Sequence, residues 1–199
     1  RYSQHDGTVQ QWKLEECTLG KINLIVGENA SGKSKVLNII GNLGDLLSGD
    51  RGLFLTANYN VKFKRDGQTI SYILKCEREA IVEEKLDIDS DNLLTRGADG
   101  IGKIRYQKHG DTRDFQAPPN QVVSVTRRDT IQHPFLEDLY QWGKSVRRYY
   151  FGTDMGKPGV VLPQKAREGS VDQHLNPKQT DRVVGIFIEG QRMFSKRFN

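Results

Sequence analysis

One stretch of the chain decides the expected fold, and it reads Gly27-Glu28-Asn29-Ala30-Ser31-Gly32-Lys33-Ser34. Phosphate groups are multiply charged, so a loop that binds them must turn several backbone N–H groups inward, and glycine permits the required backbone conformations. In a phosphate-binding loop with this spacing, Lys33 brings a positive charge to the β- and γ-phosphates and the Ser34 hydroxyl ligates Mg²⁺. The stretch therefore predicts a nucleotide site for ATP and Mg²⁺.

The residues on both sides of this loop support the prediction. Residues 21–26 end as a continuous apolar run, which is typical of a parallel strand covered on both faces. After the loop, apolar residues recur at helical spacing as far as Gly49. They are Val36, Leu37, Ile40, Leu43 and Leu47. The fold class that we expect is therefore α/β, with a P-loop NTPase core.

The pattern changes to strand-like alternation between residues 58 and 117. The dipeptide Asp66-Gly67 separates two alternating runs, which is a strong signal for a β-hairpin. Further strands are expected at residues 80–88, 101–107 and 112–116. We therefore expect an antiparallel β-subdomain inserted after the P-loop helix.

The rest of the chain predicts a return to the core and then a less regular region. Residues 121–125 resemble a strand, and Pro134 is expected to open a helix. The apolar face of that helix would consist of Phe135, Leu139, Trp142 and Val146. Residues 152–180 are rich in glycine and proline and are expected to form a long loop, followed by a helix, or a strand and a helix, at 181–198.

These segments give the expected domain organisation. It consists of P-loop core strands and a helix at 1–57, the antiparallel β-subdomain at 58–117, a return strand and helix at 118–150, and a loop and the start of a helical region at 151–199, which we expect to be truncated.

Composition places the chain among globular proteins. Of its 199 residues 36% are hydrophobic, and no run of about eighteen apolar residues is present that could cross a bilayer. The cysteines, Cys17 and Cys76, have no metal-ligand spacing and are interpreted as core thiols in a reducing cytosol. The formal charge of +5 is uneven, with 19 basic and 20 acidic side chains in residues 1–143 but 11 and 5 in residues 144–199.

Residues 19–40 closely resemble the N-terminal lobe of ABC-type AAA-family ATPases. The form Gly-Glu-Asn-Ala-Ser-Gly-Lys-Ser is typical of the branch that contains chromosome-maintenance proteins, recombination ATPases and OLD-type defence proteins. The resemblance implies an ABC-type lobe in which ATP is sandwiched between two heads. It also implies that the complete protein hydrolyses ATP and controls an effector or a DNA-processing activity, including anti-phage defence.

The resemblance also implies roles for particular residues. The nucleotide ligands would be Gly27, Glu28, Asn29, Ala30, Ser31, Gly32, Lys33, Ser34 and Lys35. Lys35 stands where the family usually has threonine, which affects a secondary contact with the α-phosphate. Gln132 would sense Mg²⁺ and the γ-phosphate, with Gln121 as the second candidate. Tyr2 and Trp12 are the candidates for stacking on adenine, although Trp12 also fits a place in the core.

The groups needed for hydrolysis are not evident in the sequence. Residues 183–190 imitate the acidic metal-binding strand of the family but lack its Asp-Glu pair, and Glu189 is interpreted as a surface residue. Phosphoryl transfer needs a second acidic metal ligand and a group that orients water. We therefore assign no catalytic residue and expect this chain to bind nucleotide better than it hydrolyses it.

The sequence is compatible with three kinds of partner and with two alternative functions. A second ATPase head in a homodimer, an effector subunit and nucleic acid are the candidate partners, and no membrane partner is expected. The basic residues after 144 would also suit a nucleic-acid-binding module in which ATP is structural. A P-loop kinase for a small molecule is the other alternative, and the long antiparallel insertion argues for the ABC type instead.

Overall fold

The computed structural model describes residues 1–148. The chain divides into two units, of which the first, Arg1–Val146, is compact and contains all the elements described below. The loop expected at residues 152–180, the elements expected at 181–198 and Glu189 lie outside the described residues.

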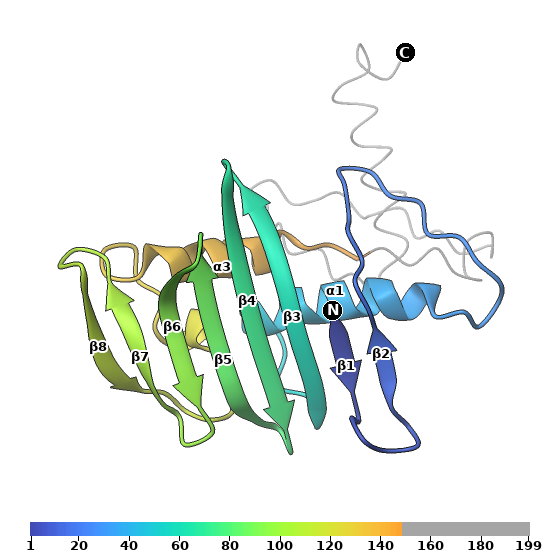
Figure 1. Cartoon of the computed structure of the whole chain (residues 1–199), viewed down its shortest axis with the longest axis horizontal. Coiled ribbons are helices and arrows are strands. Elements are labelled where there is room, and N and C mark those ends of the chain that lie inside the picture. Colours follow the sequence, from blue (N-terminus) through green and yellow to red (C-terminus); the bar gives the residue numbers. More distant parts are fainter. Residues whose placement is uncertain (149–199) are drawn as a thin grey trace, which may run out of the picture. The chain divides into compact units, whose positions relative to one another are not determined.

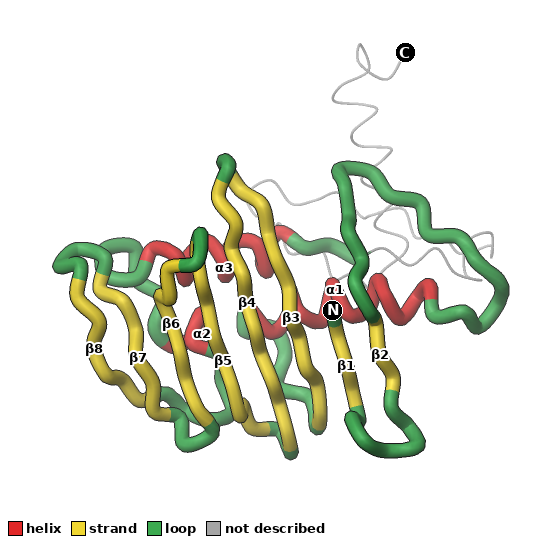
Figure 2. The backbone as a smooth tube through the Cα atoms, in the orientation of Figure 1, coloured by secondary structure: helices red, strands yellow, loops and turns green. Residues whose placement is uncertain are grey.

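A single antiparallel sheet of eight strands dominates the first unit (Figure 1). In chain order the strands are β1 (Tyr2–Gln4), β2 (Trp12–Leu14), β3 (Thr56–Arg65), β4 (Gln68–Glu77), β5 (Ala80–Ile88), β6 (Asp91–Gly97), β7 (Ile101–Tyr106) and β8 (Asp111–Gln116). They lie in the order β2-β1-β3-β4-β5-β6-β7-β8. Three helices, α1 (Lys33–Leu47), α2 (Val123–Thr126) and α3 (Pro134–Ser145), lie on one face of this sheet (Figure 2).

This architecture corrects the expected fold class, because the unit is not an α/β P-loop core with a parallel sheet. Every strand pairing in it is antiparallel. Residues 21–26, expected as the central parallel strand, form no strand, and within residues 1–148 no strand pairs with them. A parallel strand needs neighbours that cover both its faces. Instead, β1 and β2 continue the antiparallel sheet beside β3.

The antiparallel strands themselves follow the sequence pattern. Asp66 and Gly67 have φ values of 50° and 85° and form the turn between β3 and β4, which confirms the predicted hairpin. Alternate side chains of β3 and β4, such as Tyr59 and Tyr72, are buried on the helical side. The opposite side chains, such as Lys62, point away from the helices. The alternation thus places the core between the sheet and the helices.

Helices α1 and α3 confirm two predicted helices. Leu43 and Leu47 of α1 are buried, although Leu37 is 55% exposed. In α3, buried side chains from the predicted apolar face pack against the sheet, and Trp142 contacts Phe63 edge to face with ring centroids 4.8 Å apart. The predicted apolar face of this helix included Val146, but α3 ends at Ser145 and the backbone of Val146 is extended.

The predicted strand at residues 121–125 is wrong, because the chain forms the short helix α2 there. The backbone N–H of Val123 donates hydrogen bonds to both carboxylate oxygens of Glu84, at 3.0 and 3.3 Å. The Ser124 hydroxyl donates to the carbonyl oxygen of Leu47 at 3.1 Å. These tertiary contacts override the strand preference of the valines.

The carboxylate that holds α2 belongs to a fully buried ion pair. Glu84 and Arg96 lie 3.1 Å apart on neighbouring strands, and both side chains are inaccessible to solvent. The Tyr72 hydroxyl also donates to Glu84 at 2.8 Å. Arg96 donates to the carbonyl oxygens of Pro118 and Gln121. Burial raises the pKa of Glu84, whereas the neighbouring guanidinium of Arg96 lowers it. Through its hydrogen bonds to Pro118 and Gln121, Arg96 of this pair holds the segment before α2 against the sheet.

Two further expectations can be compared with the described residues. Cys76 is buried as predicted, and burial raises the pKa of its thiol to about 12. Cys17 is exposed, so its assignment to the core is wrong, because it lies in the uncovered segment between β2 and α1. Among residues 1–148, no helix combines the length and apolar character needed to cross a membrane.

Candidate functional site

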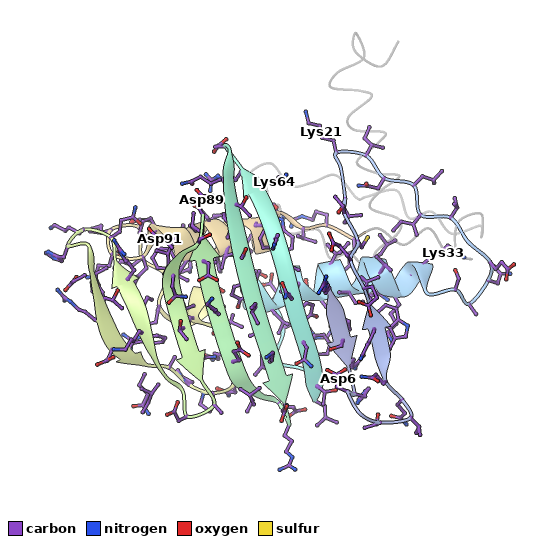
Figure 3. All side chains as sticks on the ribbon, viewed as in Figure 1. Asp6, Lys21, Lys33, Lys64, Asp89 and Asp91 are labelled. Atoms are coloured by element: carbon purple, nitrogen blue, oxygen red, sulfur yellow. The ribbon has the colours of Figure 1, made fainter. Side chains whose placement is uncertain are left out.

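The glycine-rich loop ends where α1 begins, at one end of the sheet (Figure 3). Gly32 is the N-cap residue with φ 91° and ψ 9°, and Ala30 also has a positive φ of 63°. No side chain caps the first N–H groups of α1. A helix start of this kind presents uncapped donors and the positive end of the helix dipole to an anion.

The side chain of Lys33 folds back onto the loop that precedes it. Its ammonium group donates hydrogen bonds to the carbonyl oxygens of Gly27 and Glu28, at 2.7 and 2.5 Å. It also lies 3.4 Å from the Ser31 hydroxyl. A Cβ atom on Gly27 would stand 2.9 Å from that hydroxyl oxygen, so a larger residue there would require the Ser31 side chain to move. The Lys33 ammonium is therefore held by the loop itself in the free protein.

The first turn of α1 is unusually positive. It contains Lys33, Ser34 and Lys35 and no acidic side chain. Ser34 is exposed, so its hydroxyl is accessible to a metal ion bound with a nucleotide. Cations at the N-terminus of a helix are electrostatically unfavourable, whereas anions there are favourable. The composition of this turn suits a bound polyanion.

The two aromatic candidates occupy different places behind the loop. Tyr2 is buried against Tyr59, with ring centroids 4.8 Å apart, and desolvation raises its pKa to about 12. Trp12 is half-buried and lies 6.2 Å from Tyr2. A Cβ atom on Gly32 would stand 3.6 Å from the indole of Trp12. Trp12 thus borders the loop directly, while Tyr2 is part of the core behind it.

The structure does not bring Gln132 or Gln121 to the loop. The carbonyl oxygen of Gln132 accepts a hydrogen bond from the N–H of Gln107, directly after β7. The carbonyl of Gln121 binds the buried Arg96 of β6. The loop borders Trp12 of β2, which is the edge strand at one end of the sheet. Strands β6 and β7 lie toward the other end. Gln132 therefore lies before α3 and beside the end of β7, and not with Ser34 at the start of α1.

A preformed metal cluster is not part of this region. Among residues 1–148, no group of three or more His, Cys, Asp or Glu side chains could hold a metal ion. Mg²⁺ commonly keeps several water ligands and binds through one or two protein groups together with the phosphates of a substrate. Ser34 is the protein group that could serve in this way at the loop.

The segment before the loop is apolar and uncovered. Ile22, Leu24 and Val26 are 94%, 87% and 76% exposed. Figure 2 draws this part of the chain as loop rather than strand. Its sequence suits a buried strand, but the described residues supply neither a neighbouring strand nor a layer to cover it. Within residues 1–148, the glycine-rich loop is therefore bordered by α1 and Trp12.

One contact at the site was not predicted, namely that of the Lys35 ammonium with the ring of Trp12, at 4.4 Å from the ring centroid. The two residues are far apart in sequence, and no spacing pattern connects them. Comparison of the chain with protein-family models, with curated proteins and with solved structures found no match.

Proposed function

We propose that residues 27–35 bind the phosphates of ATP together with Mg²⁺. The proposal includes the wider role implied by the resemblance, that of a cytosolic ABC-type ATPase head that dimerises on ATP and controls an effector or a DNA-processing activity. The observation that carries it is the arrangement at the start of α1. There a glycine-rich loop, uncapped N–H groups and two lysines converge with no acidic residue in the first turn.

The contacts of Lys33 support its part in this proposal. In the free protein its ammonium is bound by the carbonyl oxygens of Gly27 and Glu28. Both acceptors are neutral, and a charged phosphate oxygen makes a stronger, charge-assisted hydrogen bond. A nucleotide phosphate placed against the helix start would therefore attract the ammonium away from these carbonyls.

Titration calorimetry with ATP and Mg²⁺ tests the proposal. Lys33→Ala should abolish detectable binding, because each hydrogen bond to a charged group contributes about 1.5–3 kcal/mol. Lys21→Ala is the matched control, since Lys21 is an exposed lysine upstream of the loop and should leave affinity unchanged. Circular dichroism of both variants checks that the sheet is intact. A folded Lys33→Ala variant with wild-type affinity would disprove the phosphate site.

Hydrolysis by this chain is expected to be slow. A missing metal-holding and water-orienting pair removes transition-state stabilisation, on the order of 10³-fold or more in rate. Phosphate release measured at saturating ATP should therefore stay close to the rate without protein. Turnover at an ordinary enzymatic rate would show that catalytic groups are present in the chain.

A further inference from the structure

Strand β8 is the outermost strand at one end of the sheet, and within residues 1–148 no strand pairs with its outer edge (Figure 1). Directly after β8, the N–H of Ala117 donates a hydrogen bond toward β7, to the carbonyl oxygen of Gly100 at 3.0 Å. Backbone groups point alternately to the two sides of an antiparallel strand, so those of Thr112 and Asp114 point outward. The edge thus offers backbone donors and acceptors to a further strand.

The surroundings of this edge are basic. Residues 101–117, which include β7 and β8, contain four lysine and arginine side chains and two aspartates. Both aspartates already pair with a basic side chain of β7 or β8. The other two cations, Arg105 and Lys108, form no ion pair within the part of the chain that the structure describes. The edge therefore has an excess of positive charge and no free carboxylate in either strand.

Arg127 brings a third unpaired cation to the same edge. Its guanidinium donates a hydrogen bond to the carbonyl oxygen of Gln116 at 2.8 Å and lies 5.9 Å from the ring centroid of Phe115, on the helical face. Among residues 1–148 it has no carboxylate partner. On the opposite, open face, Arg105 lies beside Thr112 in the register of β7 and β8. Cations therefore flank the edge on both faces of the sheet.

We infer that β8 accepts an acidic, extended peptide of a partner protein as a ninth strand of the sheet. In such complexes backbone hydrogen bonds give affinity and the alternating side chains give specificity. A peptide carboxylate opposite Thr112 would lie on the face of Arg105, and one opposite Phe115 would lie on the face of Arg127. The peptide that fits best therefore carries acidic residues three positions apart.

A second copy of β8 fits this edge less well. Two-fold pairing of two β8 strands, centred on Arg113 or Asp114, places that residue opposite itself. Like charges directly opposite each other destabilise a strand pair. The edge also lies at the end of the sheet opposite to β2, which borders the glycine-rich loop. The inference is therefore independent of the proposed function.

Fluorescence anisotropy without nucleotide tests the inference. The probe is a fluorescein-labelled peptide of valine and threonine with two glutamates three positions apart. It should bind the protein, and its affinity should fall as salt concentration rises. A control peptide with lysine in place of both glutamates should not bind. Arg105→Gln and Arg127→Gln should each weaken binding of the acidic peptide about threefold, because each removes one exposed charge pair.

A matched pair of variants at one position tests the backbone contact. Thr112→Pro removes an outward N–H and should weaken peptide binding about tenfold. Thr112→Ala keeps that N–H and should bind the peptide as the wild type does. An edge strand tolerates proline where its N–H faces solvent, so the sheet should stay intact in both variants, which circular dichroism checks.

Amide exchange in the free protein is a second measurement that needs no variant. The outward N–H groups of Thr112 and Asp114 should exchange rapidly and become protected when the acidic peptide is added. Slow exchange in the free protein would overturn the inference. If it is independent of protein concentration, another segment of the chain covers the edge, and if it increases with concentration, a second copy does.

The peptide measurements can also overturn the inference. No binding at millimolar protein, equal binding of the lysine peptide, or unchanged affinity in folded Thr112→Pro would each do so. None of these results would affect ATP binding at the glycine-rich loop, which calorimetry measures separately.

Discussion

Gly143 of α3 packs directly against the main chain of α1 at Gly44. A Cβ atom on Gly143 would stand 2.6 Å from the Gly44 carbonyl oxygen and 3.0 Å from the Ser48 nitrogen. A Cβ atom on Gly44 would in turn stand 2.9 Å from the Cβ of Val146. Helices α1 and α3 therefore approach each other where both lack side chains, and this contact fixes α3 against the helix that follows the glycine-rich loop.

Gly143→Ala should destabilise the protein although alanine favours helices. Alanine gains about 1 kcal/mol over glycine in a helix interior, whereas forcing extra atoms into a packed contact costs about 1–3 kcal/mol. We expect the second effect to dominate, because the obstructing atoms belong to the backbone. Urea unfolding measures the change. Gly52→Ala, where a Cβ atom meets nothing within 4 Å, is the control and should be nearly neutral.

Breaking the buried ion pair should be among the most damaging single changes. Arg96→Met leaves the carboxylate of Glu84 buried without its cation, which costs about 3–5 kcal/mol. The double variant Glu84→Gln/Arg96→Met removes both charges and should lose less than the two single variants together. A double-mutant cycle from urea unfolding gives this coupling, and strictly additive losses would argue against a buried pair.

The exposed pair of Lys103 and Asp114 provides the comparison. The two groups lie 3.0 Å apart, but both side chains are largely exposed. Exposed ion pairs contribute little because water and salt screen them. Lys103→Met should therefore change the free energy of unfolding far less than Arg96→Met does.

His133 should make stability depend on pH. Its side chain is buried, and burial lowers its pKa, although the Asp129 charge and the hydrogen bond to the Arg105 carbonyl oppose that shift. The folded protein therefore binds this proton less readily than the unfolded chain, whose histidine titrates near 6.5. Because the unfolded state binds more protons, the stabilising contribution is present above about pH 6.5 and is lost as pH falls.

Thermal or urea unfolding between pH 7.5 and 5 measures this effect. His133→Asn keeps a side-chain donor for the Arg105 carbonyl and removes the titration, so it should flatten the pH dependence in this range. An unchanged slope in the variant would assign the effect to other groups.

Ser34 should act through Mg²⁺. If its hydroxyl is a metal ligand, Ser34→Ala should weaken ATP binding roughly tenfold in Mg²⁺ and much less in EDTA. Ser31→Ala is the matched control, since Ser31 lies near the Lys33 ammonium and its effect should not depend on the metal. Calorimetry in the two buffers distinguishes these cases, and an equal loss for Ser34→Ala in both would exclude the metal role.

Local signals in the sequence predicted the local structure well. The alternation that flanks Asp66-Gly67 gave the β3–β4 hairpin, and the helical spacing after the loop gave α1. These patterns arise because apolar residues recur on the buried side of a helix or strand, and that periodicity is visible in the sequence itself. The glycine-rich loop at residues 27–34 leads directly into α1, as its pattern predicts, and phosphate binding by this loop stays a prediction.

Long-range partners were the source of the errors. The apolar run at residues 21–26 indicates a strand that needs covering, but it does not say which segment covers it, and the described part of the chain contains none. The short helix α2 depends on a carboxylate 39 residues away in Glu84. The role of Gln132 is predicted only from its position along the chain, after the inserted sheet. Its backbone contact with Gln107 shows that it lies beside β7, toward the end of the sheet opposite to β2.

The uncovered run at Ile22, Leu24 and Val26 has a consequence for the behaviour of the isolated chain in solution. Consecutive β-branched and aliphatic side chains with free backbone groups favour intermolecular strand pairing. Lys21 and Glu28 are the charges nearest to either end of the run and carry opposite signs, so they favour antiparallel pairing with a second copy of it. Among the described residues, this segment is therefore one that we expect to promote self-association, and the effect should increase with protein concentration.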